Sequence, residues 1–440
     1  MIPRYEKKAI SKIWSENNKF QYYLDAELAI LKAQEGINVP EGISQEIRNS
    51  AKIDCERIYE IEKETRHDMI AFCTSITEKL PTSIGKFFHY GVTSSDIIDT
   101  ALSLQLRDSL KVILPAYKQL LQTLLSKAEE TKNIMALGRS HGRNAEPMSF
   151  GCKFLSFYSE LSRRYSELKD FYENELTAQF SGAVGNYTIL SPEIEKKAAQ
   201  ILGLNVEPVS TQVIPRDRIA KLVSINALFG AALERICVEL RHLHHSDIDE
   251  IEEGFSKKQK GSSTMPHKKN PIATENLTGM ARMLRSHVSV ALDNIILWHE
   301  RDISHSSTER MYLPDNLGIM LYSIERLNST LENLVVKQEN IENKVTQNFE
   351  YLSSLYLHLI LKESNIPREE VYYWVQEAAF AGKESGEAKV FHQKMKSILE
   401  RHGVNLILPE PDPESLRDVF LKHAGDIFHR TQEVYSAVTK

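Results

Sequence analysis

The segment from Gly261 to Pro271 combines the residue types that stabilise a developing negative charge. It reads GSSTMPHKKNP, so hydroxyl groups and backbone N–H groups lie beside His267 and Lys268. Backbone donors together with a lysine can hold a carboxylate, or an oxyanion that forms in a transition state. Prolines within and at the end of the segment prevent a regular helix, which predicts a loop. A solvated surface loop with ordinary lysines is the alternative interpretation, because loops of this composition are common.

Three histidines in other segments are candidates for proton transfer at neutral pH. His141 lies between two arginines in GRSHGRNAEP, His89 opens HYGVTSSD, and His67 precedes Asp68. An imidazole has an ordinary pKa of roughly 6.5 and can therefore donate or accept a proton in a reaction. GRSHGRNAEP and HYGVTSSD both contain glycine and hydroxyl groups, so we expect both to be loops between helices. A surface histidine without a role is the alternative at each position.

Two more polar clusters narrow the class of chemistry. HERDISHSSTER, which ends at Arg310, repeats the combination of arginine, histidine and hydroxyl groups. In HLHH, His242 and His245 have a spacing that suits a metal ion, but no third-ligand motif accompanies them. The sequence contains no P-loop, no Rossmann glycine pattern and no G-x-S-x-G motif. We therefore expect an enzyme that uses acid–base chemistry with no metal and no cofactor.

Composition and charge are those of an ordinary soluble protein. The 440 residues are 42% hydrophobic and 26% charged, which is typical of a globular fold with more than one subdomain. The net charge of -6 indicates neither a nucleic-acid partner nor a membrane-surface partner. The four cysteines form no CxxC pair, so we expect them to be reduced, as in cytoplasmic proteins. The N-terminus lacks a secretory h-region, and no apolar run reaches the roughly 20 residues of a membrane span.

Helical periodicity dominates the elements that must position these residues. Apolar residues recur every three or four positions between Leu106 and Leu124, and again between Leu222 and Leu243. This spacing predicts long amphipathic helices, with a kink at Pro115 in the first. Alternating segments are nearly absent, and there is no βαβ series. The sequence therefore predicts an all-α bundle of long helices, whose extra apolar faces pack within the chain or against a second copy.

The motif GSSTMPHKKNP resembles the signature loop of the fumarase/aspartase superfamily, whose members eliminate fumarate or a related acid from a succinyl-type group. His267, HYGVTSSD and ERDISHSSTER together resemble the adenylosuccinate lyase family within it. Argininosuccinate lyases typically carry glutamine in place of His267, and fumarases typically carry glycine. The resemblance extends from Arg4 and Tyr5 to the C-terminal helical region. One departure is Ser140, where the family usually has threonine, so a hydroxyl is kept and a methyl is lost.

The resemblance implies an all-α subunit of three domains, with a central bundle of long helices that forms a homotetramer. We expect an N-terminal helical domain with catalytic histidine loops over residues 1–92. A central long-helix bundle with the signature loop follows over residues 93–345, and a C-terminal helical domain over residues 346–440. Active sites in the family are built from three subunits, which would bring the separate loops together. Small succinylated purine nucleotides are the implied ligands, with no nucleic acid and no membrane.

The implied reaction is a β-elimination in purine nucleotide biosynthesis. Adenylosuccinate gives AMP and fumarate, and succinylaminoimidazole carboxamide ribotide gives aminoimidazole carboxamide ribotide and fumarate. The resemblance makes Ser262 the general base, with Ser263 left open as an alternative, and makes His141 the general acid. Lys268 and the backbone donors of the loop would stabilise the base. Glu275 would orient His141 or a neighbouring histidine.

The remaining polar residues are assigned to substrate binding by the same resemblance. His67 would act beside the general acid, either by orienting the groups of the site or by adding positive charge to it. Arginine suits the phosphate and the other anionic groups because its guanidinium binds through two parallel hydrogen bonds. The residues expected to contact substrate are Arg4, Tyr5, Arg66, Asp68, His89, Thr93, Ser94, Gln212, Asn270, Arg301, Ser306 and Arg310.

Two other functions fit the same fold. Argininosuccinate lyase or a carboxymuconate-type cycloisomerase is one, and His267 with ERDISHSSTER argues against both. A catalytically silent scaffold, such as the lens crystallins of this superfamily, is the other. A scaffold can lose Ser262, His141 or Lys268 without harm, and all three are present here.

Overall fold

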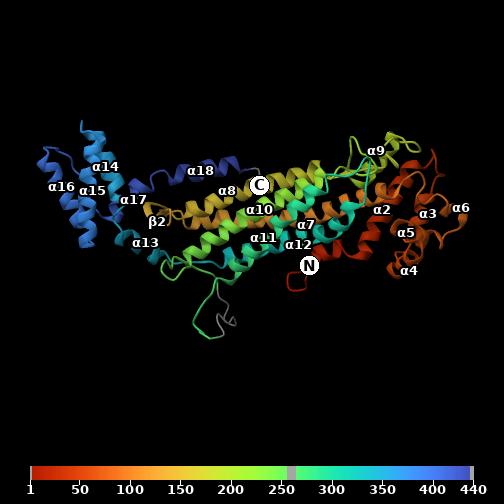
Figure 1. Ribbon diagram of the computed structural model, residues 1–440, viewed down its shortest axis with the longest axis horizontal. Helices are drawn as coiled ribbons and strands as arrows, with labels where there is room; N and C mark the ends of the chain where they lie inside the picture. Colours follow the sequence, from red (N-terminus) through yellow and green to blue (C-terminus); the bar gives the residue numbers. More distant parts are fainter. Residues whose placement is uncertain (1, 255–263, 437–440) are drawn as a thin grey trace. The chain divides into compact units, whose positions relative to one another are not determined.

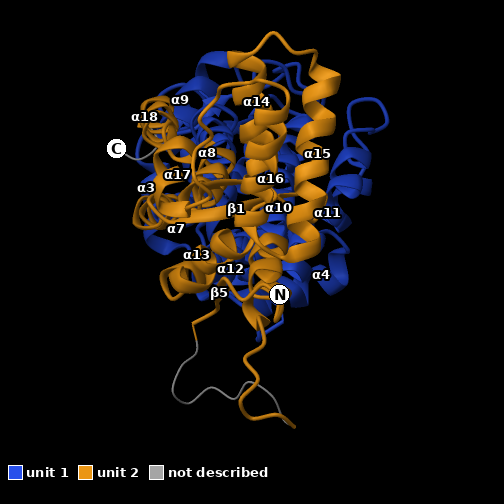
Figure 2. Cartoon of the chain, turned by 90° about the vertical axis from the view of Figure 1, so that its left-hand side faces the viewer, with its two compact units in different colours: residues 1–120, 163–235, 276–327 blue, residues 121–162, 236–275, 328–440 orange. Residues whose placement is uncertain are grey.

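The computed structural model of the chain describes residues 2–254 and 264–436. It divides into two compact units, and each unit draws on three separate stretches of sequence. Unit 1 comprises residues 1–120, 163–235 and 276–327, and unit 2 comprises residues 121–162, 236–275 and 328–440 (Figure 2).

Long helices dominate the chain and contribute residues to both units. They are α7 (Ser94–Glu130), α8 (Gly151–Asn174), α10 (Asp217–Leu243), α11 (Ile272–Asp293) and α12 (Ser304–Glu332) (Figure 1). The two apolar stretches predicted from the sequence fall on α7 and α10. All the apolar residues of the predicted spacing are buried, namely Leu106, Leu110, Ile113, Tyr117, Leu120, Leu124, Leu222, Ile225, Phe229, Leu233, Ile236, Leu240 and Leu243. The prediction of long amphipathic helices is confirmed, and α7 continues through Pro115.

Aromatic side chains join three of these helices within unit 1. The ring of Tyr117 in α7 contacts Tyr165 of α8 edge-on, with 5.6 Å between centroids. It contacts Phe229 of α10 in the same way at 5.3 Å. Edge-on pairs of buried rings are favourable beyond the area that they bury. The three helices are therefore fixed against one another around a single buried tyrosine.

The other elements of unit 1 are shorter, and several begin at a capping side chain. Ser15, Asp54 and Ser191 each accept a hydrogen bond from a backbone N–H of the helix that follows, which satisfies one of its free donors. The two short strands of the unit pair in parallel. The elements are α1 (Lys8–Ile13), α2 (Glu16–Gln34), α3 (Ile43–Ser50), α4 (Cys55–Thr65), α5 (Asp68–Thr77), α6 (Thr82–Gly85), β3 (Thr177–Ala178), α9 (Pro192–Leu202) and β4 (Asn205–Val206).

Three phenylalanines hold the N-terminal helices of unit 1 together. Phe20 of α2 stacks on Phe72 of α5, with 5.9 Å between centroids and 7° between the ring planes. Phe88, in the segment before α7, contacts the same Phe72 at 5.9 Å. All three rings are buried, so α2, α5 and the segment at Phe88 share one apolar core.

Unit 2 combines a hairpin with C-terminal helices around a second core. Tyr356 of α14 (Leu352–Glu363) stacks on Phe391 of α16 (Ala388–Arg401), with 5.3 Å between centroids. Phe349 also stacks on Phe391, with 5.9 Å between centroids. The short strands β5 (Ile251–Glu252) and β6 (Val335–Val336) pair antiparallel. The helices are α13 (Gln338–Gln347), α14 (Leu352–Glu363), α15 (Arg368–Ser385), α16 (Ala388–Arg401), α17 (Pro413–Phe420) and α18 (Ala424–Val434).

The segment GRSHGRNAEP, expected to be a loop, forms most of a β-hairpin. Strand β1 (Met135–Ser140) pairs antiparallel with β2 (Arg143–Ser149). The two residues between them, His141 and Gly142, have φ values of 54° and 74°. A hairpin turn of two residues is favoured when both have positive φ, because its twist then matches that of the strands. The loop prediction was therefore wrong here, and His141 lies at the tip of a hairpin.

The all-α fold class is confirmed, since the strands are the hairpin and pairs of two-residue strands in the described part of the chain. The three domains at 1–92, 93–345 and 346–440 stay a prediction. No helix among the described residues is long and apolar enough to cross a membrane.

Replacing Gly151 with alanine should destabilise unit 2. A Cβ atom at Gly151 would lie 2.3 Å from the carbonyl oxygen of Ala128 and 2.9 Å from backbone atoms of Lys132. The backbone must shift to admit it, so we expect a free-energy loss of about 1–3 kcal/mol, measured by thermal and urea unfolding. Gly425→Ala is the matched control, because a Cβ atom there meets nothing within 4 Å. Equal losses in the two variants would contradict the packing argument.

Candidate active site

The residues predicted to bind or react with substrate are divided between the two units. Ser262 and Ser263 lie outside the described residues. Unit 2 contains His141, Lys268, Asn270 and Glu275. Unit 1 contains Arg4, Tyr5, Arg66, His67, Asp68, His89, Thr93, Ser94, Gln212, Arg301, Ser306 and Arg310.

A cavity of about 280 Å³ in unit 1 brings three of the predicted residues together. Asp68, Ser306 and Arg310 line it beside aromatic rings that include Tyr23 and Tyr59. An Nη of Arg310 donates a hydrogen bond of 2.6 Å to Asp68. Burial alone would raise the pKa of Asp68, but the hydrogen bond and charge of Arg310 outweigh it and lower that pKa. The cavity therefore combines aromatic walls with a hydroxyl group and a guanidinium that is paired with Asp68, and its lining also contains four further carboxylates.

Arg66 and His67 form the junction between α4 and α5. Arg66 is exposed and adopts φ of 54° directly after α4. The Nδ1 atom of His67 accepts a hydrogen bond of 3.3 Å from the backbone N–H of Ile70 and so caps α5. A neutral ring that accepts through Nδ1 carries its proton on Nε2. His67 therefore presents a donor at Nε2 when it is neutral.

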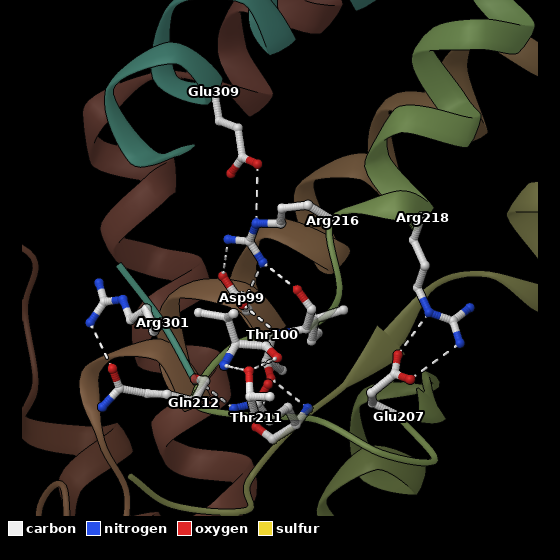
Figure 3. Close-up of polar contacts among 12 residues, drawn as sticks. Asp99, Thr100, Glu207, Thr211, Gln212, Arg216, Arg218, Arg301 and Glu309 are labelled. Atoms are coloured by element: carbon white, nitrogen blue, oxygen red, sulfur yellow. Dashed lines mark hydrogen bonds and ion pairs between the residues drawn. The ribbon is translucent and has the colours of Figure 1, made fainter. Parts of the chain in front are cut away.

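A buried ion cluster forms another part of the cavity lining. Arg216 donates to both carboxylate oxygens of Asp99, at 2.7 and 2.8 Å, and its Nε lies 3.1 Å from Glu309 (Figure 3). The three side chains are at most 7% exposed. One guanidinium faces two carboxylates, so the charge of Arg216 does not fully compensate the desolvation of both Asp99 and Glu309. Burial raises the pKa of Glu309 to about 7.

His305 lines the same cavity with an unpaired nitrogen. The residue is 3% exposed, and its Nδ1 atom has no hydrogen-bond partner within the described ranges. Burial, and then the charge of Arg216, lower the pKa of His305 to about 4, so the ring is neutral at pH 7. A buried polar atom without a partner is costly. A hydrogen bond to a bound ligand would satisfy it.

One hydrogen-bond network joins the start of α7 to the segment before α12. Asp96 accepts from the backbone N–H of Thr93 at 2.8 Å and from the side-chain amide of Gln179 at 3.3 Å. That amide also donates to the carbonyl of Gln212, whose side-chain oxygen accepts a 3.2 Å bond from Arg301 (Figure 3). Burial raises the pKa of Asp96 to about 6. The structure thus places three predicted residues, Thr93, Gln212 and Arg301, in one network.

His89 is paired with a buried glutamate. Its Nδ1 atom lies 2.6 Å from Oε1 of Glu27, which is fully buried. Burial lowers the pKa of His89, but the hydrogen bond and charge of Glu27 outweigh it and raise that pKa. The backbone at His89 has φ of 62°, a conformation that residues other than glycine rarely adopt. Glu27 therefore favours the cationic ring, which suits contact with an anion.

Tyr5 lies away from the cavity that contains Arg310. Its ring contacts Tyr322 of α12 at 5.3 Å, and the Tyr322 hydroxyl donates to Asn276 at 2.9 Å. Tyr322 is about 18 Å from Arg310 along the helix axis, at a rise of about 1.5 Å per residue. Arg4 is exposed beside Tyr5. Within one chain, these two predicted residues are not brought to the cavity.

A groove of about 920 Å³ in unit 2 brings together the predicted residues of the signature loop. Lys268, Asn270 and Glu275 line it, together with His267 and the HLHH histidines at and just after the end of α10. The start of α11 is fixed by Glu253, which accepts hydrogen bonds from two backbone N–H groups of its first residues at 3.0 and 2.9 Å. The groove therefore holds a lysine and an amide, which are donors that a bound carboxylate requires. The carboxylate of Glu275 lies in the same lining.

His141 is exposed at the tip of the hairpin and is not among the described residues that line this groove. The hairpin is anchored by Arg139, whose guanidinium lies 2.5 Å from a carboxylate oxygen of the buried Glu250. A buried ion pair of this kind fixes the position of a strand. The tip of the hairpin is thus accessible while its strand is held in place.

Several residues of the site were missed by the sequence predictions. These are charged or polar groups that line the cavity or pair with predicted residues, namely Glu27, Asp99, Arg216, His305 and Glu309. Each lies at a position where burial of a charge or a ring requires a partner. A charged residue on the apolar face of a predicted helix, such as Asp99 on α7, is the signal that can find some of them.

The chain is similar to lyases along most of its length. Residues 4–285 match a family model described as lyase. The adenylosuccinate lyase of Thermotoga maritima is 41% identical over 436 residues, which cover 98% of this chain and 100% of the relative. The adenylosuccinate lyase of Bacillus subtilis is 38% identical over 436 residues, covering 98% and 99%. That of Synechocystis is 43% identical over 380 residues, covering 86% and 88%.

Solved structures of more distant proteins share the fold. The 3-carboxy-cis,cis-muconate lactonizing enzyme of Pseudomonas putida superposes with a TM-score of 0.87 at 21% identity, covering 99% of this chain and 98% of that one. A fumarate lyase of Mesorhizobium superposes with a TM-score of 0.83 at 20% identity, covering 98% of each chain. At such identities the likeness establishes the fold alone.

Replacing Arg216 with methionine should destabilise unit 1 strongly. The substitution leaves Asp99 and Glu309 buried without their cation, and the loss of one member of a buried ion pair costs about 3–5 kcal/mol. Arg218→Met is the matched control, because Arg218 is 20% exposed beside its partner Glu207. Urea unfolding should show a clearly smaller loss for the control. Equal losses would contradict the importance of the buried cluster.

Proposed function

The chain belongs to the adenylosuccinate lyase family, and on that premise we propose how its residues divide the steps of the elimination. The reaction releases fumarate from adenylosuccinate, giving AMP, and from succinylaminoimidazole carboxamide ribotide, giving aminoimidazole carboxamide ribotide. The observation that carries this function is the identity to adenylosuccinate lyases over nearly the full chain. We place the reaction in the cytoplasm, in keeping with the free cysteines.

The elimination needs a base at the carbon that loses its proton and an acid at the nitrogen that leaves the neighbouring carbon. The electrons of the broken C–H bond form the C=C bond of fumarate. Ser262 removes the proton from the carbon next to a succinyl carboxylate, and charge develops on that carboxylate. The carbon–nitrogen bond then breaks, its electrons pass to the nitrogen, and His141 donates the proton that this nitrogen takes up. A free serine hydroxyl is too weak an acid for this role, so its anion needs strong local stabilisation. Lys268, in the same loop motif, is the cation that we propose for this stabilisation.

The groove of unit 2 is the proposed binding site for the succinyl carboxylates. Lys268 and Asn270 line it and offer an ammonium group and an amide. Glu275 lines the same groove beside His267, so we assign it to orienting an imidazole rather than to binding substrate. Thr93 and Ser94, at the start of α7, are the further proposed carboxylate ligands, because a helix N-terminus favours anions.

The cavity of unit 1 is the proposed site for the nucleotide part of the substrate. Arg310 and Ser306 line it and can bind phosphate oxygens, while the aromatic lining can contact a purine ring. Arg301, whose guanidinium donates a hydrogen bond to Gln212, is a further proposed ligand of the anionic groups. His67 presents a donor at Nε2, which suits orientation of the reacting group.

We propose that the active sites are shared among the subunits of a homotetramer. Apolar side chains are largely exposed in unit 1 on α10, α11, α12 and the segment between the last two. Exposed apolar surface of this kind usually marks an interaction site. Within one chain, His141 does not line the groove of unit 2 and Tyr5 does not line the cavity of unit 1. Assembly would bring these residues to the active sites from neighbouring subunits. The exposed residues are Leu228, Met283, Leu292, Ile296, Trp298, Ile303 and Met311.

The variants His141→Gln and Ser262→Ala test the proposed general acid and the proposed general base separately. Each removes one proton-transfer group, so we expect kcat for adenylosuccinate to fall by roughly 100- to 10,000-fold. The absorbance change on conversion of adenylosuccinate to AMP gives kcat, and fumarate should be released in equal amount. Ser263→Ala is the matched control and should retain most of the activity.

Full activity of Ser262→Ala with loss in Ser263→Ala would move the base to Ser263. Turnover that survives in His141→Gln would overturn the choice of acid while leaving the reaction in place. No turnover of adenylosuccinate by the folded wild type, with turnover of argininosuccinate instead, would overturn the proposed substrate.

The purified chain should form a tetramer in solution. Light scattering coupled to size exclusion should give about four times the 50.3 kDa chain mass. Met311→Lys, at a side chain that is 76% exposed, places a charge in the proposed interface and should shift the protein towards smaller species. Ile407→Lys, at a residue 90% exposed in unit 2, is the matched control. A monomeric wild type would contradict the proposal.

A further inference from the structure

Three side chains of different chemistry converge in unit 1. Glu27 comes from α2, Cys73 from α5, and His89 from the segment before α7. One ligand atom of each, a carboxylate oxygen, the thiol sulfur and a ring nitrogen, lies within 4.8 Å of the other two. We propose that these three residues form a binding site for a thiophilic divalent cation of the Zn²⁺ class.

The buried carboxylate is the strongest support for a ligand. Glu27 is fully buried, and only its Oε1 atom is paired, with His89 at 2.6 Å. Its Oε2 atom is buried and has no hydrogen-bond partner in the described part of the chain. An unsatisfied buried acceptor costs free energy, and a carboxylate has the greatest need of a partner. A bound cation satisfies both oxygens at once.

The aromatic core of unit 1 fixes the three ligands before any cation binds. Phe20, Phe72 and Phe88 pack on one another, and they belong to the same three segments as Glu27, Cys73 and His89. Two of them, Phe72 and Phe88, are the direct neighbours of ligands in sequence. Ligands held by packed backbones lose little freedom on binding, which is what a precise site requires.

The ligand set selects the class of cation. Thiolate, imidazole and carboxylate are the ligands of Zn²⁺, whereas Ca²⁺ and Mg²⁺ prefer oxygen alone. Ligand atoms at roughly 2.0–2.3 Å from a tetrahedral centre are about 3.3–3.7 Å apart. The ligand atoms here all lie within 4.8 Å of one another, so side-chain rotations must bring them to that spacing, and the 2.6 Å contact between His89 and Glu27 must widen. Three protein ligands leave a fourth position for water. Binding releases to solvent both the thiol proton of Cys73 and, from the cationic ring, the proton on the coordinating nitrogen of His89, as metal coordination requires.

Occupation of this site would remove His89 from substrate binding. That consequence rests on the proposed function, because it requires His89 to contact the anionic substrate. Cation binding itself does not rest on it. A spectroscopic test therefore distinguishes a failure of the site from a failure of the role assigned to His89.

The test is titration of the chelator-treated, full-length protein with Cd²⁺, a thiophilic stand-in for Zn²⁺. The thiolate-to-cadmium charge-transfer absorbance in the ultraviolet should rise to saturation at one cation per chain. Cys73→Ser should abolish this saturable band, and Cys152→Ser, at another partly buried thiol, should retain it. Glu27→Gln should weaken Zn²⁺ binding at least about tenfold, measured by competition with a chromophoric chelator. Circular dichroism establishes that each variant is folded.

A saturable band of unchanged amplitude in Cys73→Ser would overturn the site, as would the absence of stoichiometric binding in the wild type. Zn²⁺ should also inhibit turnover of adenylosuccinate by the wild type and by Cys152→Ser, but not by Cys73→Ser. Because Cys73 takes no part in the proposed reaction, its replacement should leave activity without Zn²⁺ unchanged. Stoichiometric binding without inhibition would support the site and overturn the role of His89 in substrate binding.

Discussion

The ion cluster of Arg216 with Asp99 and Glu309 is the constraint on which the arrangement of unit 1 depends. A guanidinium that is almost completely buried can remain charged only if carboxylates replace the water that it loses. Those carboxylates come from α7 and α12, and Arg216 directly precedes α10, so one side chain sets the registration of three long helices. Arg310 follows Glu309 in sequence, and the cluster therefore also determines where the proposed phosphate ligand lies.

Much of the fold follows from the sequence because burial repeats with the helical period. The apolar stripes of α7 and α10 predicted their helices, since a long stripe has few ways to be buried except against other helices. The cluster around Arg216 was missed for the opposite reason. A single buried charge has no period, and its partners come from positions far apart in the sequence. Asp99 on the apolar face of α7 was the visible sign that some cation had to be near it.

Only part of the proposed site could be predicted from the sequence. Composition singled out the segments that contain Lys268, His141 and Thr93, but resemblance to a known family supplied their roles. The hairpin shows why local pattern was insufficient. Only the two turn residues, His141 and Gly142, adopt positive φ, and a turn of that kind is hard to distinguish from a loop when the strands are short and irregular. The pairing of His89 with Glu27 joins two segments whose contact no local spacing encodes.

The division of the chain has a consequence for its synthesis. Neither unit is continuous in sequence, since unit 1 is completed by residues 276–327 and unit 2 by residues 328–440. During translation, the N-terminal helices leave the ribosome long before the helices that cover them. Domains usually fold one after another as they are made, but here the first unit must wait for three quarters of the chain. Nascent chains of this protein should therefore need protection by chaperones, and neither unit can be expressed by simple truncation.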